Sequence, residues 1–121
     1  MTPAPRRRPG LIEVLSAQGG ETFHRLLRGR QLELRDFYSA RELGRRVPSR
    51  TPWVVFVGVS MFDSRKGALT VARRRPAIVA QLALPAGRGI NYAKTASEGH
   101  YTIWAAAEDL LAAVVDVVRH P

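Results

Sequence analysis

The stretch WVVFVGVSMFDSRKGALTVARRRPAIVAQLALP, residues 53–85, decides the fold class. Its first ten residues, 53–62, form a run that is apolar on both faces, which is typical of a central strand. Gly58 inside that run predicts a bulge or the close approach of another part of the chain. Asp63 or Ser64 can then cap a short helix. The stretch therefore predicts a strand that is followed directly by a helix.

A second strand is expected after that helix. Arg73, Arg74 and Arg75 suit the C-terminal end of a helix, where the dipole favours positive charge, and Pro76 would stop it. The residues of Ala77–Leu84 alternate enough in polarity to form the next strand. Strand, helix and strand therefore follow one another within this stretch.

Weaker patterns place the remaining elements. Ser39 and Glu42 fit a capping box in front of a helix of one or two turns. The other expected elements are a helix over residues 11–15, strands over 22–27, 90–94, 100–105 and 114–118, and a helix over 108–113. Strands outnumber helices, so the sequence predicts an α+β fold: a mixed, mainly antiparallel sheet with short helices packed on it. Residues 1–10 are expected to form a flexible basic arm, and residues 11–121 a single domain.

The chain of 121 residues has a formal net charge of +9, and the positive charge is concentrated in its first part. Residues 1–75 hold 16 Lys and Arg against 6 Asp and Glu, whereas residues 76–121 hold 3 against 4. A basic surface attracts polyanions, although it also improves solubility without any partner. The arginines expected to contact nucleic-acid phosphates are Arg6, Arg7, Arg8, Arg28, Arg30, Arg35, Arg73, Arg74 and Arg75.

Composition disfavours several kinds of site and location. The chain has no cysteine, which excludes disulfides and thiolate chemistry, and its three histidines lie far apart, so no metal site is expected. Its longest apolar runs are far shorter than the roughly 20 residues of a membrane-spanning helix. The first residues lack the pattern of a signal peptide. We therefore expect a cytoplasmic protein without a membrane segment, and its excess of Arg over Lys suggests a GC-rich bacterial genome.

The segment GHYTIW, residues 99–104, carries the densest set of functional groups. His100, Thr102 and Trp104 would share one face of a strand, with Tyr101 on the other. His100 can shuttle a proton, and Trp104 or Tyr101 can serve as a stacking platform. Both rings are also typical of core packing.

Other polar positions are weaker candidates. His24 and Arg25, in the first strand, can present a ring and a guanidinium to a phosphate, or can simply face solvent. Ser60 lies near a strand end, where a hydroxyl can face a cleft or be buried and hydrogen bonded. Glu98, in a polar loop, is a candidate general base. The chain contains no Walker loop, GxGxxG or GxSxG motif.

Four segments resemble those of a known family. FHR (23–25), VSMFDS (59–64), GALTVA (67–72) and IVAQLALP (78–85) follow one another as the corresponding segments do in ADP-ribosyltransferase-like domains. In that family a first strand carries Arg or His, and a later strand ends in a hydroxyl-rich turn before a helix and a further strand. The resemblance covers residues 22–105, and the GHYTIW segment is also similar to small bacterial proteins without an assigned role.

The resemblance implies an enzyme that uses NAD, either an ADP-ribosyltransferase or an NAD glycohydrolase, such as a toxin or effector. It implies that His24 or Arg25 holds the phosphate or ribose of NAD, that Ser60 supports the nicotinamide pocket, and that Tyr101 stacks. The catalytic acid would be Glu98, Glu108 or Asp109. The candidate catalytic residues are thus Glu98, His100 and Tyr101, and the candidate NAD-binding residues are His24, Arg25, Ser60 and Trp104.

Two other functions stay open. The first is a nucleic-acid-binding module, with arginines on the phosphates and Trp104 or Tyr101 stacking on the bases. The second is a non-enzymatic protein whose basic surface meets an acidic protein partner.

Overall fold

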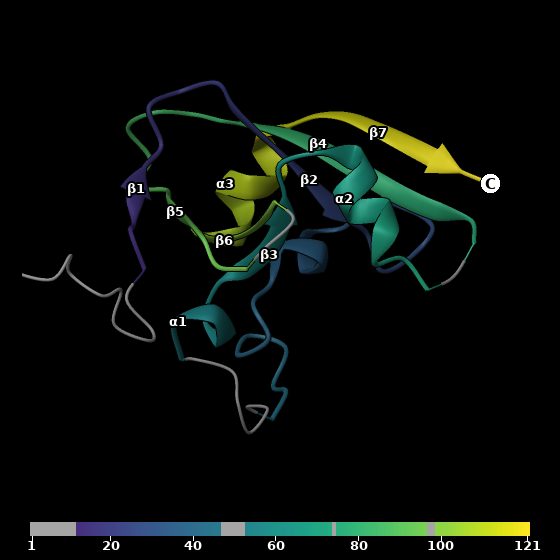
Figure 1. Ribbon diagram of the computed structural model, residues 1–121, viewed down its shortest axis with the longest axis horizontal. Helices are drawn as coiled ribbons and strands as arrows, with labels where there is room; N and C mark the ends of the chain where they lie inside the picture. The colour runs from purple at the N-terminus through teal and green to yellow at the C-terminus, as the bar shows by residue number, and fades with distance from the viewer. Residues whose placement is uncertain (1–11, 47–52, 74, 97–98) are drawn as a thin grey trace, which may run out of the picture.

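Seven strands form one sheet in the computed structural model, which describes residues 12–46, 53–73, 75–96 and 99–121 (Figure 1). The strand order is β1-β5-β6-β3-β2-β4-β7, and each described pairing is antiparallel. The elements in chain order are β1 (Leu15–Ser16), β2 (Glu21–Leu26), the 3-10 helix η1 (Leu34–Phe37), α1 (Trp53–Phe56), β3 (Val59–Phe62), α2 (Arg65–Thr70), β4 (Ala77–Leu84), β5 (Asn91–Lys94), β6 (His100–Trp104), α3 (Ala107–Ala112) and β7 (Val114–His120). This arrangement confirms the predicted α+β fold with a mainly antiparallel sheet.

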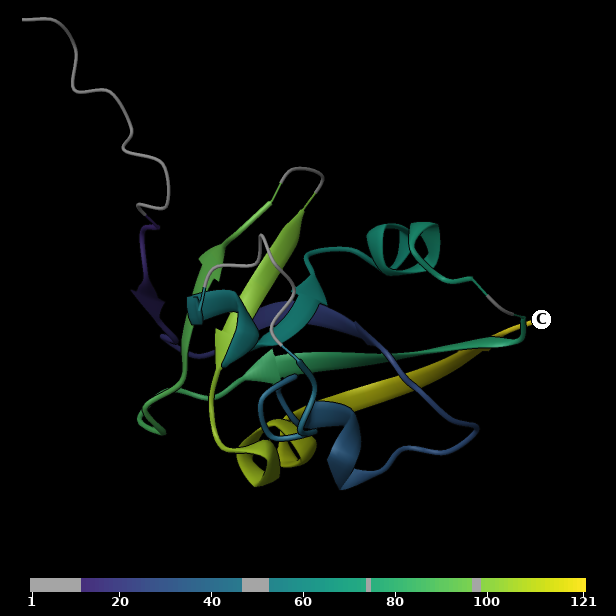
Figure 2. The same ribbon diagram turned by 90° about the horizontal axis from the view of Figure 1, so that it is seen from below.

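The helices divide between the two faces of the sheet. Helix α2 packs on one face against β2, β3 and β4, whereas α3 and η1 lie together on the other face (Figure 2). The fully buried side chains of the core include Phe37, Met61, Leu82, Ile103 and Leu110. Burying a side chain of this size contributes about 1.5–3 kcal/mol, so we expect this core to supply most of the stability. No helix in the described ranges is long and apolar enough to cross a membrane.

Strand β4 has the predicted bounds and a central place in the sheet. It lies between β2 and β7, and six of its eight residues are buried. Strand β2 pairs with it from Glu21 opposite Leu84 to Leu26 opposite Val79. The predicted strands that became β2, β5, β6 and β7, and the predicted helix that became α3, end within two residues of their expected bounds.

The predicted single strand over residues 53–62 is wrong in its first half. That half forms α1, and only β3 joins the sheet, where it pairs with β6. The rings of Trp53 and Phe56 pack with centroids 5.5 Å apart, at a spacing of three residues that a helix brings onto one side. The indole N–H of Trp104 donates to the Val54 carbonyl at 2.7 Å and fixes α1 against the end of β6. These tertiary contacts override the strand propensity of the sequence WVVF.

Gly58, between α1 and β3, lies close to β6, which confirms the predicted close approach. A Cβ at this position would overlap the methyl group of Thr102 and lie 3.0 Å from Trp104 Nε1. Because Thr102 is fully buried and cannot move aside, we expect Gly58→Ala to lower the free energy of unfolding by about 1–3 kcal/mol. Urea unfolding measures the change. Gly29→Ala is the matched control, because a Cβ there meets no atom within 4 Å, and equal stability of the two variants would contradict the close packing.

The predicted helix over residues 11–15 is wrong in the part that the structure describes. Leu15 and Ser16 form the edge strand β1, opposite Tyr92 and Asn91 of β5. The Ser16 hydroxyl donates to Asn91 Oδ1 at 3.2 Å. A helix of five residues is not stable by itself, whereas β5 offers backbone partners.

Ser39 and Glu42 make the predicted reciprocal hydrogen bonds. The Glu42 N–H donates to Ser39 Oγ at 3.1 Å, and the Ser39 N–H donates to Glu42 Oε1 at 2.9 Å. The residues that follow form a hydrogen-bonded turn and not the expected helix. Gly44, at a φ of +73°, takes the chain out of the helical region after one turn.

Helix α2 begins as predicted but ends earlier. Ser64 Oγ accepts a hydrogen bond from the N–H of the third helical residue at 3.0 Å, which confirms the cap. The helix ends at Thr70, where two β-branched residues, Thr70 and Val71, weaken its continuation. Arg73 and Arg75 were expected in the last helical turn, and this prediction is wrong. They lie in the connection between α2 and β4.

Candidate functional site

A hollow of about 910 Å³ opens where β2 and β3 diverge. These strands share one register pair, His24 opposite Phe62, whereas β2 and β4 share six. The walls come from the end of β2 and the chain after it, from β3, and from the connection between α2 and β4. We call this hollow the arginine cleft, after its lining residues Arg28, Arg30, Arg73 and Arg75.

Antiparallel pairing explains why these arginines meet. Arg28 and Arg30 follow the last residue of β2, and Arg73 and Arg75 precede the first residue of β4. The end of β2 lies beside the start of β4, because the Leu27 N–H donates to a β4 carbonyl at 2.8 Å. Two clusters that are distant in the sequence therefore reach the same end of the sheet.

The arginine cleft carries positive charge without a matching acid. None of the described residues that line it is Asp or Glu. Asp36, whose charge acts on Arg28, is buried, and its two oxygens accept the backbone N–H groups of Arg28 at 3.0 Å and Glu33 at 2.8 Å. The carboxylate is thus used within the fold.

Arg28 lines the cleft close to other positive charges. Burial first, and then the charge of Arg45, lowers the pKa of Arg28, while Asp36 opposes this effect. Its Nε atom is buried and has no hydrogen-bond partner among the described residues. An anion bound in the cleft would offset the repulsion between the guanidinium groups.

Arg25 also lines the arginine cleft, but its guanidinium belongs to the framework. Its Nε donates to the Asp36 carbonyl at 2.9 Å, and its Nη1 donates to the Ser60 carbonyl at 2.8 Å. The side chain thereby joins β2 to β3 where their ladder is interrupted. Burial, and then the charge of Arg28, lowers the pKa of Arg25 to about 10, so it stays protonated at neutral pH. This geometry does not favour the predicted role of Arg25 as a ligand of NAD.

Ser60 and His100 are two further predicted site residues at the arginine cleft. His100 Nδ1 lies 2.9 Å from Thr95 Oγ1, and the imidazole meets the Phe62 ring edge to face, with centroids 5.4 Å apart. Burial lowers the pKa of His100, so the imidazole is neutral at pH 7. The cleft thus gathers three predicted site residues, which are Arg25 of β2, Ser60 of β3 and His100 of β6.

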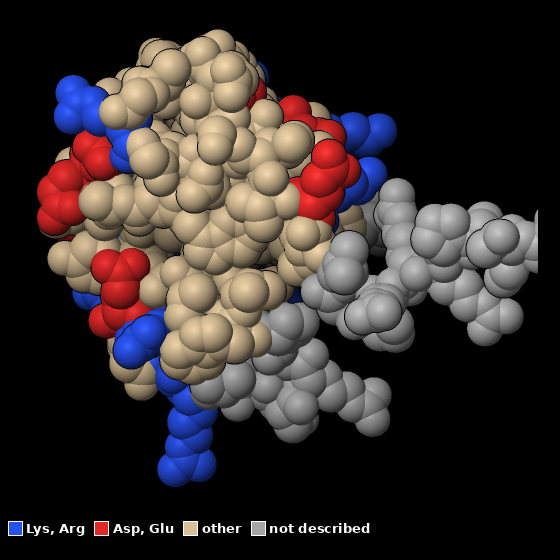
Figure 3. All heavy atoms as spheres, turned by 90° about the vertical axis from the view of Figure 1, so that its left-hand side faces the viewer, with Lys and Arg blue, Asp and Glu red and all other residues tan. Residues whose placement is uncertain are grey.

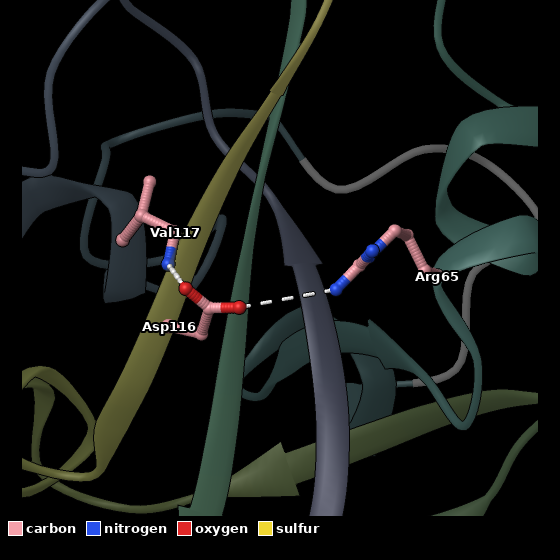
Figure 4. Close-up of polar contacts among 3 residues, drawn as sticks. All are labelled: Arg65, Asp116 and Val117. Carbon is pink, nitrogen blue, oxygen red and sulfur yellow. Dashed lines mark hydrogen bonds and ion pairs between the residues drawn. The ribbon is translucent and has the colours of Figure 1, made fainter.

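His24 does not line the arginine cleft. It is buried under α2, where Arg65 extends over β2 and β4 to Asp116 of β7 (Figure 4). Arg65 Nη2 lies 3.9 Å from Asp116 Oδ2, and Asp116 Oδ1 accepts the Val117 N–H at 2.9 Å. Burial, followed by the charge of Arg65, lowers the pKa of His24, with Asp63 opposing. The ring is therefore neutral at pH 7 and shielded from the cleft.

Tyr101 and Trp104 lie away from the arginine cleft. Tyr101 packs against Phe23 with ring centroids 5.0 Å apart, beside the hydrophobic core. Trp104 lines a separate hollow of about 260 Å³ with Val14 and Val54. The β1 end of the molecule is largely uncharged at its centre, with charged groups around the margin (Figure 3). The structure therefore does not bring these two rings into one site with His100.

Some predicted site residues cannot be placed relative to the cleft. Glu98, Arg74, Arg6, Arg7 and Arg8 lie outside the described residues. Glu108 and Asp109 lie in the first turn of α3 and do not line the arginine cleft. Arg35 lies in η1, and its charge acts on Arg28. Within the described ranges, no three His, Asp or Glu side chains are grouped as metal ligands are.

Sequence reasoning missed the apolar wall of the cleft. Leu26, Phe62, Val71 and Ile78 line it beside the arginines. One signal was present, since Ser60 and Phe62 lie two residues apart in a strand and must share a face.

No family model matches the chain, and it matches neither a curated protein nor a solved structure. The resemblance to ADP-ribosyltransferase-like domains stays a prediction.

Proposed function

We propose that the protein binds nucleic acid and that the arginine cleft contacts its phosphates. The observation that carries this proposal is the convergence of Arg28, Arg30, Arg73 and Arg75 on one hollow without an acidic lining residue. A guanidinium group donates two parallel hydrogen bonds to a phosphate, which makes arginine well suited to this contact. The net charge of +9 adds long-range attraction for a polyanion.

The salt dependence of binding tests this proposal. If four arginines each replace a counterion on a single strand, the slope of log Kobs against log salt concentration is about −2.8. Fluorescence anisotropy with a labelled oligonucleotide, from about 50 mM to about 200 mM KCl, measures that slope. A slope near zero, or no binding at the lowest salt concentration, would contradict the proposal.

An acidic protein partner would use the same positive charge. Poly-glutamate with as many charges as the oligonucleotide separates the two ligands in a competition assay. We expect poly-glutamate to be the weaker competitor, because a nucleotide offers a base to the apolar lining of the cleft as well as a phosphate to its arginines, whereas glutamate offers only a carboxylate. If poly-glutamate displaces the labelled oligonucleotide at a concentration equal to or lower than that of unlabelled oligonucleotide, an acidic protein partner is favoured instead.

The NAD-dependent enzyme implied by the resemblance is the second candidate. The observation that favours it is that Ser60 and His100 share the cleft with arginines able to bind a pyrophosphate. Nicotinamide release from NAD by the purified protein tests it directly. No release, together with no rise in Tm at millimolar NAD, would remove this candidate and leave the binding proposal untouched.

A further inference from the structure

We propose that the arginine cleft holds an unpaired nucleotide of a single strand, with the base against its apolar wall and the phosphates at its arginines. This inference rests on the proposed function and adds the class of nucleic acid that is recognised. A cleft that contacted phosphates alone would need only its charged rim.

The apolar wall is the first argument. Leu26, Val71 and Ile78 line the same hollow as the arginines, together with Phe62 and His100. Small-molecule sites combine mainly apolar walls with a few polar groups that fix orientation, and their volumes are roughly 300–1,000 Å³. The cleft, at about 910 Å³, has this composition and is large enough for a nucleotide.

The aromatic corner is the second argument. Phe62 and His100 meet at an interplanar angle of 76°, and both are only partly buried. Thr95 at His100 Nδ1 fixes the imidazole, and burial keeps it uncharged. Two rings at this angle do not form one flat platform, so a base would stack on a single ring of the pair, and base–aromatic stacking does not depend strongly on which base is present.

The third argument is that an unpaired base can reach the apolar wall of the cleft more easily than a paired base can. A base in a duplex must lose its stacking and pairing, at a cost of a few kcal/mol, before it can enter the cleft, whereas an unpaired base does not have this cost. The arginines before β4 and after β2 line the same cleft as the apolar residues, so a strand can place its phosphates at the arginines while one base enters. The geometry therefore selects single strands over duplexes.

Comparison of oligothymidine with an abasic strand of the same length tests the inference in the wild-type protein. The two eight-nucleotide probes carry the same phosphates, and only the first carries bases. We expect oligothymidine to bind roughly 5- to 100-fold more tightly, which is the gain from stacking one base. Equal affinities would overturn this inference but not the proposed function. If neither probe nor a duplex binds, the proposed function itself fails.

Two variants locate the base. Phe62→Leu is expected to remove most of the preference for oligothymidine while the affinity for the abasic strand stays within twofold. Trp104→Leu, in the other hollow, is the matched aromatic control and should keep the preference. Loss of the preference in Trp104→Leu alone would overturn the assignment to the arginine cleft. Thymidine monophosphate is expected to compete far more weakly than the octamer, and competition at equal concentration would overturn the assignment to a strand.

Discussion

Replacement of Arg28, Arg30, Arg73 and Arg75 by glutamine is expected to lower the affinity for a single-stranded oligonucleotide by roughly 10²–10³-fold near 0.1 M salt. Each guanidinium that neutralises a phosphate of a single strand releases about 0.7 of a counterion, so four contacts contribute about 2.8 logarithmic units at that concentration. The fold should persist, because these side chains lie at the end of the sheet and make no ion pair that holds the described elements together. Fluorescence anisotropy measures the affinity, and circular dichroism confirms the fold.

Pairs of substitutions distinguish the cleft from net charge. Arg73→Gln with Arg75→Gln should lower affinity by roughly 25-fold, as two lost phosphate contacts require. Arg88→Gln with Lys94→Gln removes the same net charge from exposed positions outside the cleft, and it should change affinity by less than about threefold. If both pairs have the same effect, binding depends on overall charge and the arginine cleft is not its site.

Arg25→Ala is expected to lower the free energy of unfolding by about 3–5 kcal/mol. The substitution would leave the carbonyls of Ser60 and Asp36 without their donors and would empty the space between β2 and β3. An unsatisfied buried acceptor costs about 1–3 kcal/mol, and the cavity adds to this. Urea unfolding followed by circular dichroism gives the value, with the slope m compared to confirm a two-state transition.

Two further substitutions separate the causes. Arg25→Met fills the space but offers no donor. Its free energy of unfolding should therefore lie between those of Arg25→Ala and the wild type. Arg30→Ala, in the chain just after β2, removes an arginine that makes no such bonds in the described structure and should cost less than about 0.5 kcal/mol. A stability of Arg25→Ala within 1 kcal/mol of the wild type would show that the bridge between β2 and β3 is dispensable.

Sequence patterns correctly predicted the strands and helix starts that depend on local sequence and not on contacts with distant residues. Ala77–Leu84 is a largely buried strand between two prolines, and Ser64 has a side chain that caps a helix start. Trp53–Phe56 shows where such patterns fail, because the sequence WVVF suits a strand but its contacts with Trp104 make it a helix. Short apolar runs do not distinguish the two states without knowledge of their neighbours.

The candidate site was only partly predictable, for a related reason. The sequence marked both arginine clusters but not their meeting, which depends on the pairing of β2 with β4. It also treated Arg25 as a ligand residue, whereas the interruption of the ladder between β2 and β3 gives its guanidinium two carbonyl partners. Neither the register of strands nor the place where two strands diverge can be determined from one chain by periodicity alone.

Backbone amide shifts on titration with oligothymidine test the central claim most directly. Binding in the arginine cleft should move the signals of residues 26–30, of Phe62 and of the connection between α2 and β4. The signals of Val54 and Trp104, at the other hollow, should stay in place. Shifts centred on Val54 and Trp104, or no shifts at saturating oligonucleotide, would contradict the account.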